Sequence, residues 1–317
     1  MGRLLIALGT GLVFCAFAPA EVAPRTFELN DGRFTELPTT QPAAETPPDA
    51  TLKRAETLID RRSFAAARRE VLPWLLANRG KPNYDLGLYL MAQAVNGDED
   101  PLKAFYYCDE LLDTFPASSY YSSGLELQYQ IADSLLSGRR IKVLGVPFLD
   151  GTDEAVEMMF RIQQRSPGSP LAEQSLRRTA DFYFADGQYD LAADVYGAHA
   201  RSYPRSPDAP EILLRQAFSN YAQFTGVRFE PTPLVNARAQ MTDLIGRYPE
   251  VAERENIPAF VDAIDKTLAR KLWVTADFYR RTDKPDAANV ILNVLVRDYP
   301  QSDEAQQARQ LLGPSGS

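Results

Sequence analysis

One spacing of small and large residues occurs three times along the chain, and each copy ends at a proline. Small alanines let two antiparallel helices approach closely, larger residues three or four positions away fill the seam, and proline ends the second helix. The repeat therefore predicts stacked helical hairpins. The three copies are Ala92, Val95, Ala104, Cys108, Leu111, Pro116; Ala180, Tyr183, Ala192, Tyr196, His199, Pro204; and Ala276, Tyr279, Ala288, Leu292, Leu295, Pro300.

Three further pairs fit this pattern, although two of them have longer connections. Their helices contain Ala55 and Ala67, Ala132 and Ala155, and Ala217 and Ala237. A last helix is expected near Asp303–Leu312. We predict an all-α, right-handed α-solenoid of tetratricopeptide-like hairpins over residues 51–312, with five to six pairs plus a C-terminal helix. No sheet is expected, and residues 313–317 are predicted to be a disordered tail.

The first twenty residues are typical of a secretory signal peptide. Arg3 precedes an apolar run from Leu4 to Ala18, and the small residues around Pro19 predict cleavage after Ala20. Cys15 follows Leu12 at the spacing of a bacterial lipoprotein box, but that box has a small residue where Phe14 stands. An ordinary signal helix is favoured over lipidation of Cys15, and the lipidated alternative stays open.

Residues 21–50 are predicted to be a flexible proline-rich tether. Four prolines lie between Pro38 and Pro48, with no large apolar side chain to bury. Residues 26–34 also contain two short alternating runs around Asn30-Asp31-Gly32, a signal for a hairpin turn. Because an isolated two-stranded hairpin is marginal in water, the flexible alternative is favoured there.

Several classes of function are disfavoured by composition. The chain has one histidine, two cysteines and a formal charge of −8, which leaves little for a His-based triad, a Cys/His metal site or a nucleic-acid surface. His199 occupies a seam position that is leucine in the other copies, so we expect a packed, hydrogen-bonded histidine; Cys108 is expected to be a buried thiol. We predict no enzymatic activity, no cofactor and no metal.

The remaining candidate is a binding surface. In such a stack the first helix of each pair lines the concave face, where a peptide or partner domain could bind. The residues predicted to point there are Tyr89, Gln93, Asn96, Gln174, Arg177, Asp181, Trp273 and Asp277. The apolar insertion at 141–149 either folds back over the repeats or docks a partner, and folding back is favoured.

The C-terminal repeats resemble those of the BamD family, also called YfiO. The resemblance is carried by residues 268–279, Ala287-Ala288 and residues 297–302, and by residues 224–238 with residues 246–249 of the preceding repeat. It covers roughly residues 52–312, although that family usually has about five repeats.

The resemblance implies a non-catalytic, periplasm-facing scaffold of the outer-membrane β-barrel assembly machinery. Its partners would be periplasmic domains of a BamA-like barrel-insertion protein and unfolded segments of outer-membrane proteins. The implied location is the periplasmic side of the outer membrane, peripheral or lipid-anchored, or the periplasm if Cys15 is not lipidated. The alternative function is a soluble periplasmic adaptor of cell-envelope or peptidoglycan machinery.

Overall fold

The computed structural model describes residues 27–30, 33–36, 48–143 and 146–313, which form two units. The predicted signal peptide, its cleavage site after Ala20 and Cys15 lie outside these ranges, as do residues 314–317 of the tail. In the first unit, β1 (Phe27–Asn30) pairs antiparallel with β2 (Arg33–Glu36). Where the sequence favours a flexible segment, the two strands therefore pair as the alternative hairpin, because alternating runs flank a turn-forming sequence.

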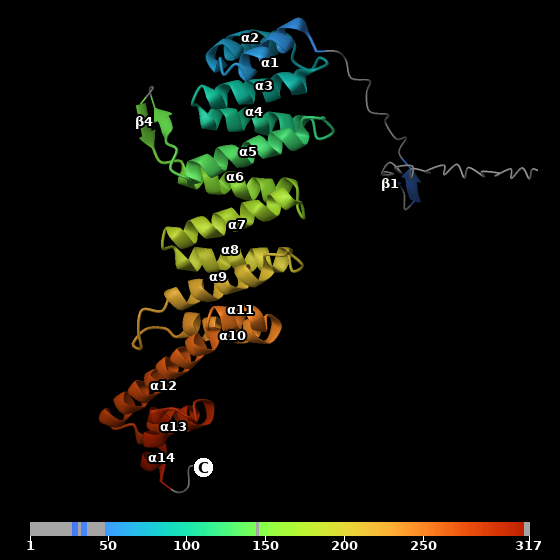
Figure 1. The fold of residues 1–317 in the computed structure, drawn as a ribbon. Helices are drawn as coiled ribbons and strands as arrows, with labels where there is room; N and C mark the ends of the chain where they lie inside the picture. The colour runs from blue at the N-terminus through green and yellow to red at the C-terminus, as the bar shows by residue number, and fades with distance from the viewer. Residues whose placement is uncertain (1–26, 31–32, 37–47, 144–145, 314–317) are drawn as a thin grey trace, which may run out of the picture. The chain divides into compact units, whose positions relative to one another are not determined.

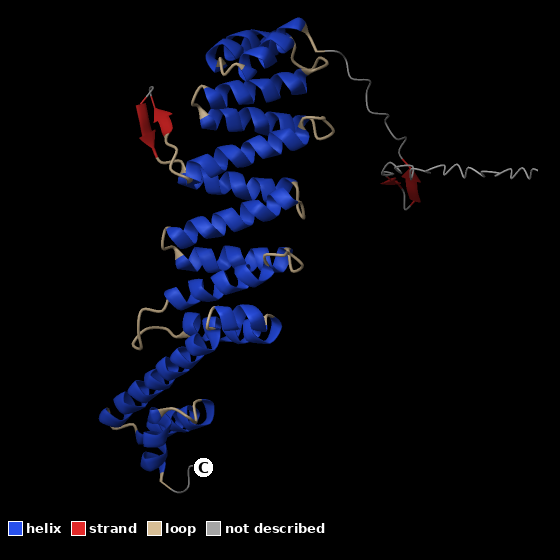
Figure 2. Cartoon of the chain, viewed as in Figure 1, coloured by secondary structure: helices blue, strands red, loops and turns tan. Residues whose placement is uncertain are grey.

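The second unit is a stack of helical hairpins (Figures 1 and 2). The prediction of six pairs and a terminal helix is confirmed for residues 48–313. The pairs are α1 (Ala50–Asp60) with α2 (Phe64–Ala77), α3 (Tyr84–Gly97) with α4 (Pro101–Thr114), α5 (Tyr121–Leu136) with α6 (Thr152–Arg165), α7 (Pro170–Ala185) with α8 (Tyr189–Ser202), α9 (Ala209–Ala222) with α10 (Thr232–Arg247), and α12 (Ile257–Arg281) with α13 (Pro285–Asp298). The short α11 (Pro249–Arg254) precedes α12, and α14 (Asp303–Leu312) ends the stack.

The predicted seam positions form the core of the stack. The six repeated alanines of the three copies are at most 1 % exposed, and the large residues that follow them on the second helices are at most 2 % exposed. Burial of these side chains, rather than a disulfide, holds the pairs together, since Cys108 is the one cysteine among residues 48–143 and 146–313 and its thiol is free and buried.

Serines start two of the helices. The hydroxyls of Ser169 and Ser302 each accept a hydrogen bond of 3.1 Å from the backbone N–H three residues later. These bonds satisfy donors that have no partner within the helix, so both residues act as N-caps.

The insertion between α5 and α6 contains a two-stranded antiparallel sheet, so the expectation of a fold without a sheet is wrong. β3 (Ile141–Val143) and β4 (Val146–Leu149) pair antiparallel, because this short run is rich in β-branched residues and contains Gly145 between the strands. Its first residue, Ile141, is buried against the end of α5 near Gly151. The hairpin stands away from the helices in Figure 1, so the favoured prediction that it folds back over the repeats is wrong.

The second insertion, between α9 and α10, is fixed to the stack by a lysine. The Lys271 ammonium on α12 donates to the carbonyl oxygens of Val227 (3.0 Å) and Phe229 (2.6 Å). α12 is 25 residues long and begins well before the segment in which the repeat predicts a helix. This length lets α12 contact α10 as well as α13 and α14.

Candidate partner-binding surface

The eight residues predicted to line the concave face lie on three separate helices, each of them the first of its pair. Tyr89, Gln93 and Asn96 are on α3; Gln174, Arg177 and Asp181 are on α7; Trp273 and Asp277 are on α12.

On α3, two of the three predicted residues line a hollow. Tyr89 and Gln93 face residues of α5 across an open space of about 400 Å³. The Gln93 amide donates to the Tyr89 hydroxyl at 3.2 Å, and the Tyr89 ring stacks on Tyr120 with 5.6 Å between centroids. Burial raises the pKa of Tyr89, so its hydroxyl stays protonated. This hollow presents neutral hydrogen-bonding groups together with the carboxylate of Glu126 on α5.

Asn96 on α3 has a different environment. Its side-chain oxygen accepts from the Arg139 guanidinium at 2.7 Å, and its backbone carbonyl accepts from the same guanidinium at 2.8 Å. Arg139 lies just before β3, so these contacts hold the connection into the hairpin. Asn96 is thereby engaged within the chain.

On α7, the predicted residues form an ion-pair network with α9. The Arg177 guanidinium contacts the carboxylates of Asp208 and of Glu211 (3.1 Å) and lies 3.8 Å from Asp181. Asp181 also accepts the Tyr196 hydroxyl at 2.5 Å, and burial raises the pKa of that tyrosine. Arg215 also lies 3.9 Å from Glu211, so two arginines stand among these three carboxylates.

Two hollows lie along α7 and α9. The smaller, about 170 Å³, is lined by Gln174, Arg177 and Asp208 among others. The larger, about 430 Å³, has apolar walls from Phe184, Leu214 and Phe218 and charged groups that include Arg215, whose guanidinium lies 5.6 Å from the Phe184 ring centroid. The sequence reasoning missed the larger hollow. Its only sequence signal is a pair of aromatic residues on successive first helices.

On α12, the two predicted residues contact neighbouring side chains of the C-terminal helices. Trp273 is partly buried against the core between α12, α13 and α14. Asp277 forms an ion pair of 3.0 Å with Arg281 one helical turn later. Neither residue lines a hollow described above.

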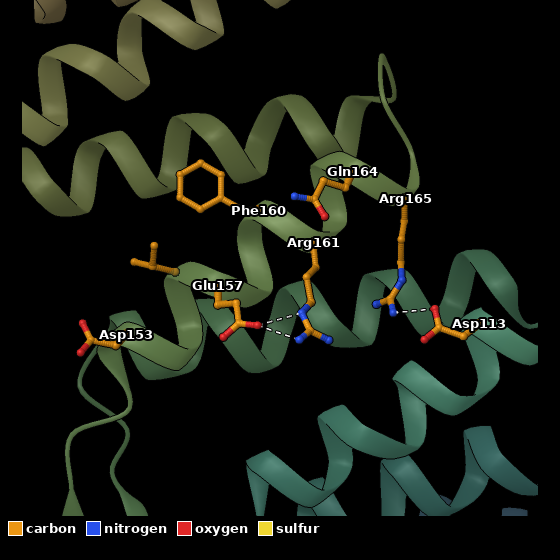
Figure 3. A pocket seen from close by; sticks show the side chains of 8 residues that line it. Asp113, Asp153, Glu157, Phe160, Arg161, Gln164 and Arg165 are labelled. Carbon is orange, nitrogen blue, oxygen red and sulfur yellow. Dashed lines mark hydrogen bonds and ion pairs between the residues drawn. The ribbon is translucent and has the colours of Figure 1, made fainter.

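A further hollow, about 740 Å³, lies on second helices, which the sequence reasoning did not consider (Figure 3). Seven of its eight lining residues belong to α6, and Asp113 comes from α4. At its edge Arg165 contacts Asp113 at 2.8 Å and Asp109 at 2.6 Å, and Arg161 contacts Asp109 at 2.7 Å. The buried Gln128 amide on α5 also donates to Asp109 at 2.7 Å. This network joins two successive pairs.

The residues with potential chemistry are buried in the seams. Cys108 is fully buried, which raises the pKa of its thiol and makes a thiolate unfavourable. His199 is also fully buried, but neither ring nitrogen has a hydrogen-bond partner among the described residues, so the prediction of a hydrogen-bonded histidine is wrong. The nearest acid, Glu173, lies 3.6 Å from Nε2, and burial lowers the pKa of the imidazole. Across residues 48–143 and 146–313, no group of three or more His, Cys, Asp or Glu could hold a metal ion.

Comparison with known families identifies the C-terminal half. A model of the family YfiO, outer membrane lipoprotein, matches residues 150–313, just over half of the chain. The chain belongs to the YfiO family. The matched region runs from the start of α6 to the end of α14, so the pairs before the β3–β4 hairpin lie outside the match.

Individual relatives of this YfiO member are distant. The outer membrane protein assembly factor BamD of Caulobacter vibrioides is 22 % identical over 43 % of this chain and 45 % of its own length. BamD of Rickettsia prowazekii is 21 % identical over 49 % of this chain and 62 % of its own length. The chain thus spans about half the length of the curated relatives it matches.

Solved structures similar to this chain include tetratricopeptide-like proteins. They include a Podosopora anserina putative kinesin light chain (14 % identity, 68 % of this chain, 93 % of that chain, TM-score 0.34) and the type IV pilus biogenesis factor PilW (16 % identity, 81 % and 96 %, TM-score 0.30). These TM-scores are low, so the fold assignment rests on the helix pairs themselves.

Proposed function

We propose that the chain is a non-catalytic scaffold of outer-membrane β-barrel protein assembly, as its BamD relatives are named, acting at the periplasmic face of the outer membrane. The observation that carries this proposal is the YfiO match over α6–α14. A scaffold needs surfaces that bind and orient partners, and the hollows along α3–α5 and α7–α9 are candidates for such surfaces.

The proposed partner is a periplasmic domain of a BamA-like barrel-insertion protein, and unfolded outer-membrane protein segments are further proposed ligands. The hollow along α7 and α9 combines aromatic walls with Arg215 and Arg254, which are paired with Glu211 and Glu255 of the same lining. Aromatic residues and arginines are enriched at protein-binding surfaces. The eight predicted surface residues remain part of this proposal only where they line hollows, namely Tyr89, Gln93, Gln174 and Arg177.

Attachment to the membrane is a separate part of the proposal. No helix within the described ranges is both long and apolar enough to cross a membrane. The family description favours a lipid anchor, for which Cys15 is the candidate. The mass of the mature N-terminus tests this directly: an acylated Cys15 supports an anchored scaffold, and a free Glu21 supports the form cleaved after Ala20.

The partner proposal is tested by affinity purification from envelope extracts. The wild-type chain should recover the barrel-insertion protein, and the double variant Arg215→Glu with Arg254→Glu should recover at least about tenfold less, because charge reversal at an interface costs several kcal/mol. Arg280→Glu with Arg281→Glu, at the exposed end of α12, is the matched control and should recover as much as wild type. Failure of the wild type to recover any barrel-insertion protein would overturn the proposal.

A further inference from the structure

The first helix pair carries the opposite charge from the rest of the chain. Residues 50–81 contain eight Lys or Arg and only three Asp or Glu, whereas the whole chain has 34 basic and 42 acidic residues. One tenth of the length therefore holds nearly a quarter of the basic residues. Such a basic segment in an acidic protein indicates a surface that faces negative charge.

The outer face of α2 adds exposed apolar side chains to this charge. Leu76 is 78 % exposed, more than any other large apolar side chain that the structure describes, and Leu72 is 40 % exposed one turn earlier. Arg69 lies on the same exposed stripe. The opposite face of the helix is buried through Val71 and Trp74, so the stripe points directly away from the core.

Basic residues lie at both ends of this stripe. Arg61 and Arg62 precede α2, Arg79 and Lys81 follow it, and all four are exposed. Among the described residues none of the four is in an ion pair, whereas Arg54 and Arg68 are paired with Glu70 and Asp98. Arg61, Arg62 and Arg79 are thus available to an external anion, whereas the Lys81 ammonium donates to the Ala77 carbonyl oxygen (3.3 Å) and to the Asn78 side-chain oxygen (3.2 Å).

The N-terminal segment joins the folded body beside this helix. The Asp49 carboxylate caps α1 by accepting the Thr51 N–H at 2.6 Å, and it also accepts the Trp74 indole N–H at 3.0 Å. Trp74 lies on α2 between Leu72 and Leu76. The described chain thus enters the body at the helix pair that carries the stripe, with Asp49 bonded to the buried face of α2.

We propose that the outer face of α2, with Arg61, Arg62, Arg69, Leu72, Leu76 and Arg79, binds an anionic lipid surface. The leucines insert among the acyl chains at the headgroup boundary, and the cations at the two ends of the helix contact lipid phosphates. Apolar residues between cations favour a lipid surface over an acidic protein, which would need partners placed for each charge. A lipid anchor held by one or a few acyl chains gains stability from such a basic patch.

The inference rests on the proposed location at the outer membrane but not on the proposed protein partner. Residues 21–317, without the predicted signal sequence and Cys15, are mixed with vesicles of phosphatidylcholine containing about one third phosphatidylglycerol and then floated. The protein should float with these vesicles and not with pure phosphatidylcholine. Raising the salt from about 0.1 M to about 0.5 M should release it, since exposed charges are then screened.

Two double variants locate the contact. Arg61→Glu with Arg62→Glu, and separately Leu72→Ser with Leu76→Ser, should each weaken vesicle binding at least about tenfold. The control for the leucines is Val290→Ser, because Val290 on α13 is 62 % exposed at the other end of the stack. Arg280→Glu with Arg281→Glu controls for net charge. Both controls should bind like wild type, and circular dichroism confirms that every variant is folded.

Either of two results would overturn the inference. One is that anionic vesicles do not bind the wild-type chain, or bind the α2 variants as well as wild type. The other is that the α2 variants lose recovery of a protein partner while vesicle binding is absent, which would make this face a protein interface. Because no partner is present in the flotation assay, failure of the lipid inference is distinguishable from failure of the scaffold proposal.

Discussion

The first helix pair and the region matched by the YfiO family share one packing scheme but have different surfaces. In residues 50–81 the exposed side of α2 carries leucines and unpaired cations, whereas the α7–α9 surface carries two arginines among carboxylates and an aromatic hollow. The seams beneath both surfaces are alanines against large apolar residues. Packing is thus repeated while surface chemistry is not, which allows one stack to contact different partners at different levels.

The strongest test of the shared packing compares one seam position in two copies. Leu111 on α4 and Leu295 on α13 occupy the same repeat position, and both are fully buried. Leu111→Ala and Leu295→Ala should each lower the free energy of unfolding by about 2–5 kcal/mol, because each leaves a cavity in a seam. Urea unfolding followed by circular dichroism measures both.

The control for this pair is Leu72→Ala, since Leu72 is 40 % exposed and should change stability by less than about 0.5 kcal/mol. If Leu111→Ala were as mild as this control while Leu295→Ala was severe, the two regions would not share one packing scheme.

The seams could be predicted from the sequence because small residues, large residues and prolines recur at fixed spacing. The short α11 was not predicted, because Pro249 follows the end of α10 as a closing proline does and also starts α11, where a proline at the first helical position costs no hydrogen bond. The same reasoning failed for residues 141–149, because a short apolar run is compatible with a strand as well as a loop.

Only part of the candidate surface could be predicted, because the position of a helix in the repeat does not determine the shape of the surface around it. A repeat register indicates which helix faces outward, but a hollow depends on the side chains that two neighbouring pairs contribute. Gln93 lines a hollow because α5 presents small serines opposite it, whereas Trp273 is covered by α13 and α14. Long-range partners such as Arg139 for Asn96 have no signal in local spacing.

A second test concerns how successive pairs are joined. Arg165 is 14 % exposed and contacts Asp109, Asp113 and the buried Gln128, whereas Arg297 is 73 % exposed and contacts only its neighbour Asp298. Arg165→Met should cost about 2 kcal/mol, because it leaves Asp109 and Gln128 short of a partner. Arg297→Met should cost less than about 0.5 kcal/mol.

Urea unfolding of these two variants gives the comparison directly. Equal and small effects would show that the network at the α4–α6 hollow adds no stability beyond that of a surface ion pair. The double variant Asp109→Leu with Arg165→Met separates pairing from burial, since removing both partners should restore part of the lost stability.

The smallest expected effect concerns His199, which stands where Leu111 and Leu295 stand in the other copies. Burial lowers the pKa of His199, so the unfolded chain binds a proton near pH 6.5 while the folded chain does so only at lower pH. Stability from this group is present above that range and is lost as the pH falls through it. Since its ring nitrogens lack partners, His199→Leu should be more stable than wild type by about 1 kcal/mol at pH 7.5.

The difference between His199→Leu and wild type should grow as the pH is lowered from about 7.5 to about 5.5, because only the wild type loses stability by protonating its unfolded state. Urea unfolding at both pH values measures this difference while the contributions of the carboxylates, common to both proteins, cancel. The variant Glu173→Gln is measured in the same way, since Glu173 is the acid nearest to the ring. If the advantage of leucine shrank at low pH, protonated His199 would be stabilised in the folded state, and Glu173 rather than burial would govern its titration.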